Sequence, residues 1–325
     1  MSLPPSVTAV IPVYNSEATL PALVEGVSSA LGSVSERWEI ILVNDASRDG
    51  SWAVMERLMG KHPNLVIVDL ARNYGQHAAL LCGVRMARGE VVVTLDDDLQ
   101  HPPEEIPALL DALEGGVDVV YGRARQDEHQ AYRRVGSRVV RLALSLTVGP
   151  DVARNASAFR AFRTRLRDAF ADFRGPYVSL DVLLSWGSRG SRVVTVSHHP
   201  RQRGRSNYTL RRLVHHAMDV ITGFSTVPLQ IASLLGLGAT VFGVGVLIYV
   251  VGRYIIEGGS VPGFPFLASI ISIFAGVQLL TLGVFGQYLG RIHQRALERP
   301  AYVVRTHQDP DATPPATPRT PGSPP

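Results

Sequence analysis

The stretch VVVTLDDDLQHPPEEIP, residues 91–107, changes character halfway along its length. It begins with β-branched apolar residues that are typical of a buried strand, and it continues into three adjacent aspartates, Asp96, Asp97 and Asp98. Three neighbouring carboxylates repel one another unless water or a cation screens them. The stretch therefore ends either in a solvated turn or beside a positive charge.

The residues around this stretch predict a parallel sheet. Short apolar runs alternate with helix-like segments through the first half of the chain, and runs that are apolar on both faces indicate parallel strands covered on both sides. The runs are residues 7–14, 39–45, 65–70, 90–96 and 117–122, and the helical segments are 17–32, 51–62, 75–88 and 104–115. Ligands bind beyond the carboxyl ends of such strands. We therefore expect Asp45 and the three aspartates to meet there, which favours a binding site over a solvated turn.

The second half of the chain has a different organisation. Residues 133–190 look helical but irregular, a strand follows at 191–199, and residues 207–226 show the apolar stripe of an interfacial helix. Two stretches without charge, residues 229–252 and 261–290, are long enough to cross a bilayer. We expect a catalytic domain over 1–206, a transmembrane pair within 227–304, and a disordered Pro- and Thr-rich tail over 305–325.

The charge pattern predicts an orientation in the membrane. Arginines cluster on both outer flanks of the two apolar stretches, so the positive-inside rule places the catalytic domain and both termini in the cytoplasm. The glycine-rich stretch LLGLGATVFGVGV, residues 234–246, favours packing against another copy of the chain, so a homo-oligomer and a monomer both stay open.

Composition narrows the chemistry. The net charge is +4, and arginine patches suit nucleic acid, anionic lipid or a phosphorylated substrate. Neither a basic groove interleaved with aromatics nor zinc-finger spacing is present, so we do not expect nucleic acid as a partner. Cys82, the sole cysteine, lies in an apolar helical stretch and is expected to be a small buried residue. A carboxylate cluster at a strand end suits a hard cation, Mg²⁺ or Mn²⁺, which commonly bridges carboxylates and substrate phosphates.

Several motifs in order resemble those of family-2 glycosyltransferases. They are VIPVYNSEATL, ILVNDASRDGS, RNYGQHAAL, TLDDDLQHPPEEIP and RQRGRSNY, and they are followed by the two apolar stretches and GQYLGRIHQRALERPAYVV. The two apolar stretches together with GQYLGRIHQRALERPAYVV are similar to the polyprenyl-phosphate branch of this family. That branch includes dolichol-phosphate mannose synthases, bactoprenol glucosyltransferases and undecaprenyl-phosphate aminoarabinose transferases. RNYGQHAAL leans toward the aminoarabinose group. The resemblance covers residues 7 to about 304 and implies an α/β, Rossmann-like GT-A domain with a mostly parallel sheet, followed by interfacial helices and a two-helix transmembrane hairpin.

The resemblance also implies roles for single residues. The nucleotide pocket would be lined by Pro12, Tyr14, Glu17, Asp45 and Asp96, with Asp45 accepting hydrogen bonds from the base. Asp98 and Gln100 would ligate the metal, and the donor diphosphate would be bound by Arg201, Gly204 and Ser206. The catalytic set would be Asp96, Asp98 and Arg201. Asp97 stands where relatives often carry alanine, so its carboxylate is expected to be surplus.

An acceptor phosphate needs anion binders of its own. Arg133 and Ser137 are four residues apart on an expected helix, so they share one face and match the Arg-x-x-x-Ser pair of the dolichol-phosphate mannose synthases. Arg123 or Arg125 would complete the site. Asp181 is either a further site carboxylate or an ordinary residue on a helix face, and we expect the second.

The function implied is the inverting, metal-dependent transfer of one sugar from a UDP- or GDP-linked donor to undecaprenyl or decaprenyl phosphate. The product would serve cell-envelope glycan modification at the cytoplasmic membrane. Two alternatives stay open: a polysaccharide or glycolipid synthase of the same fold, and a catalytically silent nucleotide-binding scaffold. The sequence lacks the Q-x-x-R-W motif that processive synthases usually carry, which argues against the first alternative.

Overall fold

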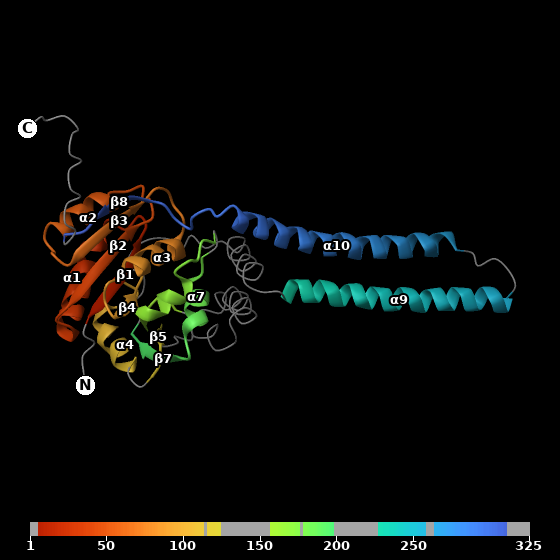
Figure 1. The fold of residues 1–325 in the computed structure, drawn as a ribbon, viewed down its shortest axis with the longest axis horizontal. Helices are drawn as coiled ribbons and strands as arrows, with labels where there is room; N and C mark the ends of the chain where they lie inside the picture. Colours follow the sequence, from red (N-terminus) through yellow and green to blue (C-terminus); the bar gives the residue numbers. More distant parts are fainter. Residues whose placement is uncertain are drawn as a thin grey trace, which may run out of the picture.

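A computed structural model of the chain describes residues 6–113, 116–124, 157–175, 178–197, 227–257 and 263–310. One eight-stranded sheet organises the described part outside two long helices, with the strand order β7-β5-β6-β4-β1-β2-β3-β8 (Figure 1). The strands are β1 (Val7–Val13), β2 (Trp38–Asn44), β3 (Leu65–Leu70), β4 (Val91–Thr94), β5 (Val119–Ala124), β6 (Arg160–Arg163), β7 (Ser191–Val196) and β8 (Val304–Gln308).

The centre of the sheet is parallel, as the apolar runs predict. β1 lies between β4 and β2 and pairs with both in parallel, and β2 pairs in parallel with β3. Side chains alternate between the faces, so Val7 and Ile11 join one core cluster while Val10 joins the other. One face packs against α1 (Leu20–Val34), α2 (Ser51–Met59) and α4 (Ile106–Ala112), and the other against α3 (Gln76–Met86) and α7 (Leu180–Gly187). Two 3-10 helices, η1 (Pro103–Glu105) and η2 (Thr164–Phe170), complete this part.

The expectation of helix throughout residues 133–190 is wrong where β6 lies. β6 runs antiparallel between β4 and β5, and Arg160 occupies a position that is 1% exposed. A buried arginine does not look like a strand residue in the sequence. It is tolerated because Asp181 of α7 pairs with it, with 2.5 Å between Arg160 Nη1 and Asp181 Oδ1.

Two long helices follow, α9 (Val227–Glu257) and α10 (Phe264–Ala296). Both contain segments long and apolar enough to cross a membrane, at 227–256 and 273–294, with mean hydropathies of 2.3 and 1.4 and no part of those windows buried. α9 extends beyond the expected 229–252 at both ends, whereas α10 begins three residues later than the expected 261–290 and ends six residues later. They lie side by side, and α10 runs back toward the sheet (Figure 1). The interfacial helix expected at 207–226 lies outside the described residues.

One glycine of the expected oligomer-forming stretch contacts α10 of the same chain. A Cβ atom added to Gly243 would lie 2.5 Å from Phe274 Cζ, so this glycine permits close approach of the two helices. Gly236, Gly238 and Gly245 meet nothing within 4 Å. Packing of these three against another copy stays a prediction.

The chain returns to the sheet after α10, which corrects the expected domain boundary. β8 pairs antiparallel with β3, matching Leu70 with Val304 and Ile67 with Gln308. Residues 305–308 therefore belong to the folded domain and not to a disordered tail. Backbone hydrogen bonding to the open edge of β3 decides this, since VRTHQ has almost no apolar pattern. The remainder of the expected tail, from residue 311 on, lies outside the described residues.

Substitution of Gly89 tests the packing at the start of β4. A Cβ atom there would lie 2.7 Å from Thr8 N, a backbone atom that cannot rotate away. We expect Gly89→Ala to lower the free energy of unfolding by about 1–3 kcal/mol, the usual cost of overpacking. Chemical denaturation in detergent, followed by tryptophan fluorescence, measures this. Gly190→Ala is the matched control, because nothing lies within 4 Å of its added Cβ; equal stability of the two variants would contradict the packing argument.

Candidate active site

The loops after the parallel strands form one edge, called here the rim: residues 14–17 after β1, 45–50 after β2, 71–76 after β3 and 95–100 after β4. Three of these loops contain a non-glycine residue with positive φ, namely Asn15 (55°), Ala46 (53°) and Leu99 (58°). Such backbone costs on the order of 1–3 kcal/mol per residue and gathers at functional sites, where surrounding contacts hold it in place. The parallel register of β4, β1, β2 and β3 brings these four loops to one edge of the sheet.

Asp97 connects two of the rim loops, so the expectation that its carboxylate is surplus is wrong. Its Oδ2 accepts a hydrogen bond from Tyr14 N at 3.0 Å and another from the Ser16 hydroxyl. Thr19 Oγ1 also donates to the carbonyl of Asp97 at 2.7 Å. Burial raises the pKa of the Asp97 carboxyl, and the bonds from Ser16 and Tyr14 partly offset that rise. Asp97 therefore holds the loop after β4 against the loop after β1.

Asp45 shapes the neighbouring loop after β3. Its two carboxylate oxygens accept hydrogen bonds from Tyr74 N (2.7 Å) and Gly75 N (2.8 Å), and the residue is 3% exposed. Burial raises the pKa of Asp45, while the two backbone bonds act in the opposite direction. Each carboxylate oxygen has a second lone pair. The base contact that the resemblance implies would have to use those remaining lone pairs.

The other expected nucleotide-site residues lie in and beyond β1. Pro12 is buried within the strand, and Tyr14 follows it with 42% of its surface exposed. Glu17 Oε2 accepts a hydrogen bond from Gly50 N at 2.8 Å. Gly50 is the N-cap of α2, where an acidic side chain is favourably placed against the helix dipole. Glu17 therefore ties the β1 loop to the start of α2.

Asp96 and Asp98 lie on either side of Asp97 and are partly exposed. Gln76 Nε2 donates to Asp96 Oδ1 at 2.6 Å, and Gln100 N donates to Asp98 Oδ1 at 3.1 Å. Within the described ranges no three His, Cys, Asp or Glu side chains gather closely enough to hold a metal by themselves. The oxygen donors at 96, 98 and 100 instead fit a hard cation that takes its remaining ligands from water and substrate phosphate, as Mg²⁺ usually does.

The strand register brings Arg123 to the same edge. Arg160 of β6 is opposite Thr94 of β4 and opposite Tyr121 of β5. Arg123 and Asp96 each lie two residues further along, on strands separated by β6. Adjacent strands are about 4.8 Å apart, so the two backbones are about 10 Å apart at the rim. The remaining expected anion binders, namely Arg125, Arg133, Ser137, Arg201, Gly204 and Ser206, lie outside the described residues.

The sequence did not reveal several polar contacts at the rim and behind it. Gln76 contacts Asp96, although the motif RNYGQHAAL that contains it was singled out only as a resemblance. Asp181 is 7% exposed and paired with Arg160, so it is a buried ion-pair partner and not an ordinary helix-face residue. Burial, followed by the charge of Asp181, raises the pKa of Tyr121 beside them. Cys82 is buried as expected, and burial raises the pKa of its thiol to about 12.

Comparison with known proteins identifies the class to which this fold and rim belong. Residues 8–170 match the family model "Glycosyl transferase family 2". Proteins named undecaprenyl-phosphate 4-deoxy-4-formamido-L-arabinose transferase are 35% identical in Aeromonas hydrophila, over 92% of both chains, and 33% identical in Salmonella choleraesuis, over 95% of both chains. The relative from Pseudomonas aeruginosa is 35% identical over 92% of this chain and 89% of its own length.

The chain therefore belongs to glycosyl transferase family 2 and is a glycosyltransferase. The similarity to the polyprenyl-phosphate branch that the motifs predict is confirmed, and the silent scaffold is set aside. A solved structure, glucosyl-3-phosphoglycerate synthase from Mycobacterium tuberculosis, shares the fold with a TM-score of 0.50 and 20% identity over 67% of this chain and 76% of its own. That protein was crystallised with Mn²⁺, uridine diphosphate and phosphoglyceric acid.

The raised pKa of Asp97 predicts a pH dependence of stability. The folded protein releases this proton at a higher pH than the unfolded chain does, so stability falls as pH rises from the ordinary aspartate pKa to the folded value. Asp97→Asn keeps an acceptor for Tyr14 N but no longer titrates. We expect Asp97→Asn to reduce the loss of stability with rising pH to the part that Asp45 contributes. Free energies of unfolding measured at several pH values in the acid range test this. Asp111→Asn, at an exposed position of α4, is the control; identical pH profiles for Asp97→Asn and wild type would contradict the assignment.

Proposed function

We propose that this glycosyltransferase transfers a single sugar from a nucleotide-sugar to a polyprenyl phosphate at the cytoplasmic face of the membrane. One observation carries the proposal: similarity to undecaprenyl-phosphate sugar transferases extends over 303 residues of this chain. A match of that length has to include the apolar helices as well as the catalytic domain. The polysaccharide-synthase alternative has no comparable support.

The acceptor supplies its own nucleophile in the proposed reaction. A phosphate monoester has a second pKa of about 6, so it is largely dianionic at neutral pH and needs no protein base to attack carbon. A phosphate oxygen forms a bond to the anomeric carbon, and the bond from that carbon to the donor diphosphate breaks. The nucleoside diphosphate leaves with the electron pair, and a single displacement inverts the anomeric centre.

The protein's part is to position two anions and to stabilise the leaving diphosphate. Asp98 and Gln100 would hold Mg²⁺ or Mn²⁺, with Asp96 at the nucleotide end. When bound, that cation would neutralise charge on the diphosphate oxygens. Arg201, with Gly204 and Ser206, would bind the diphosphate through forked hydrogen bonds. Arg123, Arg125, Arg133 and Ser137 are the proposed acceptor-phosphate groups. The position of Arg123 at the rim supports its membership of this set.

The membrane arrangement follows the distribution of arginine. The segment between the two apolar stretches contains a single arginine, Arg253, and no lysine, whereas the outer flanks are rich in arginine. Under the positive-inside rule the sheet domain and both termini face the cytoplasm. The two apolar helices would then keep the rim within reach of the phosphate end of a lipid acceptor.

Product analysis tests the activity. The full-length protein in detergent is incubated with undecaprenyl phosphate, Mn²⁺ or Mg²⁺, and a panel of UDP- and GDP-sugars that includes UDP-4-deoxy-4-formamido-L-arabinose. We expect one donor to give a lipid-linked monosaccharide detectable by mass spectrometry, and none when the lipid or the metal is omitted. Absence of a lipid-linked sugar with every donor would contradict the proposal.

The role of Asp98 is tested by substitution. Asp98→Ala removes a metal-binding carboxylate, and loss of one group that stabilises transition-state charge costs about 100- to 1000-fold in kcat. We expect a rate decrease of this size with little change in thermal stability. Asp111→Ala removes an exposed carboxylate from α4 and should leave the rate unchanged. Full activity of Asp98→Ala would refute the assignment.

A further inference from the structure

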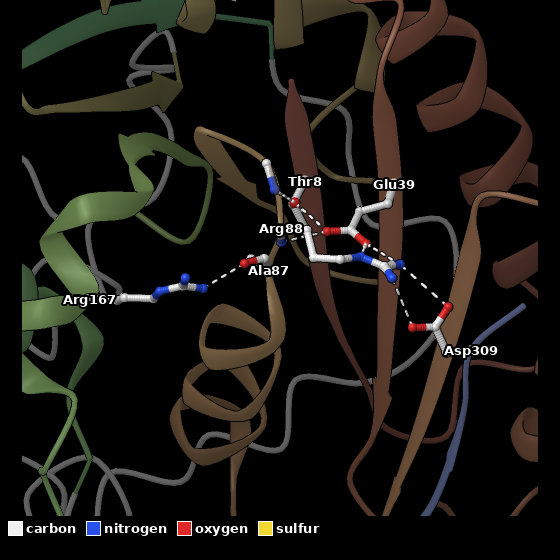
Figure 2. A network of polar contacts seen from close by, with 7 residues as sticks. Thr8, Glu39, Ala87, Arg88, Arg167 and Asp309 are labelled. Atoms are coloured by element: carbon white, nitrogen blue, oxygen red, sulfur yellow. Dashed lines mark hydrogen bonds and ion pairs between the residues drawn. The ribbon is translucent and has the colours of Figure 1, made fainter. Parts of the chain in front are cut away.

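The strand that follows the apolar helices is held to the sheet by an ion pair at each end. Near its start, Arg305 Nε donates to Asp69 Oδ2 of β3 at 2.6 Å. Just beyond its end, Asp309 Oδ2 accepts from Arg88 Nη1 at 3.1 Å, and Arg88 Nε also donates to Glu39 Oε2 at 2.8 Å (Figure 2). The Arg88 pair lies beside Thr8 of β1, at the edge opposite the rim. The Arg305 pair lies toward the rim.

Asp69 connects β8 to the interior of the sheet. It is 3% exposed, and its second oxygen, Oδ1, accepts from Asn44 Nδ2 at 2.8 Å. The register agrees with this contact, since Asp69 is opposite Asn44 on β2 and opposite Thr306 on β8. A buried carboxylate needs partners for its oxygens, and here the two donors come from different strands. The side chain of Asp69 thus links the last strand of the chain to the second.

Asn44 extends the link into the rim. It is the last residue of β2 and is 1% exposed. Its Oδ1 accepts from Ser47 N at 3.1 Å, and the Ser47 hydroxyl accepts from Asn15 N at 3.0 Å. Asn15 Oδ1 in turn accepts from Arg48 N at 2.7 Å. Asn15 has a left-handed backbone, and so does Ala46, which precedes Ser47. This series of hydrogen bonds therefore ends at two residues whose backbone conformation has to be held in place by surrounding contacts.

The hydrogen-bond partners of Asn44 fix the orientation of its side-chain amide. An amide has a donor end and an acceptor end, and Asp69 offers Asn44 only acceptors. The NH₂ group of Asn44 therefore faces Asp69, and its oxygen faces Ser47 N. Without the Arg305–Asp69 pair, the group that orients this amide would lose its charged partner.

We propose that Arg305, Asp69 and Asn44 are positioning residues for the nucleotide side of the rim. Through them, docking of β8 sets the conformation of the loops at 14–17 and 45–50. The inference rests on the proposed function in that these loops are the ones assigned to the donor nucleotide. A second contact supports it: Ala71 N donates to Val303 O at 2.9 Å, at the start of the loop whose Tyr74 and Gly75 bind Asp45.

Amide hydrogen exchange on the full-length protein in detergent tests the coupling without any substrate, because exchange reports local opening. In Arg305→Met we expect peptides covering 14–17 and 44–48 to exchange roughly tenfold faster, as loss of a hydrogen bond to a charged group implies. Asn44→Ala removes the amide but leaves the Arg305–Asp69 pair in place, and it should accelerate the same peptides. Asp309→Asn, at the opposite edge, is the matched control and should leave them unchanged.

Binding of UDP and GDP with Mn²⁺, measured by calorimetry on the same proteins, tests the functional consequence. We expect the Kd of the nucleotide that wild type binds to rise about tenfold in Arg305→Met and Asn44→Ala, but not in Asp309→Asn. The proposal would be overturned if exchange at both loops were unchanged in Arg305→Met, or if Asp309→Asn accelerated it equally. It would also be overturned if the Kd were unaltered although exchange was faster. If wild type bound neither nucleotide, the proposed function would fail, and the exchange data alone would still decide whether β8 positions the rim.

Discussion

The register of β1 against its two parallel neighbours is the constraint on which the rim depends. Val13 lies opposite Asn44, so β1 and β2 end at the same level. Val10 lies opposite Thr94, so β4 ends three residues earlier relative to β1, and Asp97 comes level with Val13. That offset lets the Asp97 carboxylate reach Tyr14 N across the gap beyond the paired part of β4. A shift of one residue would turn the side chains of β4 to the other face of the sheet and move Asp97 out of line with Tyr14 N.

The rim carboxylates divide into two groups with different partners. Asp45 and Asp97 are turned toward backbone N–H groups and hold the loops after β3 and β1. Asp96 and Asp98 contact the side chain of Gln76 and the backbone of Gln100, and remain partly exposed. Hydrogen bonds to Asp97 reduce the repulsion that three adjacent carboxylates would otherwise create. The structural role of Asp97 thus falls between two carboxylates to which we assign ligand binding as a proposal.

Sequence reasoning succeeded where a local pattern has one physical meaning. Short apolar runs separated by helical segments, as at 65–70, indicate buried parallel strands, and the carboxyl ends of parallel strands share an edge. It failed where a distant partner decides. Arg160 can enter a strand because Asp181, far along the chain, neutralises it, and the polar strand β8 exists because β3 has an open edge. The role of Asp97 was likewise hidden, since the backbone N–H that it binds belongs to a residue 83 positions away.

The position of β8 at the end of the described chain has a consequence for biosynthesis. A ribosome makes both apolar helices before it makes Val304–Gln308, so the described sheet cannot be complete until both helices have been synthesised. Until then β3 is an edge strand with unpaired backbone groups, the kind of edge that associates with other chains. Completion of the sheet therefore comes after synthesis of the two apolar helices, and a nascent chain halted before α10 would leave the backbone groups at the edge of β3 exposed.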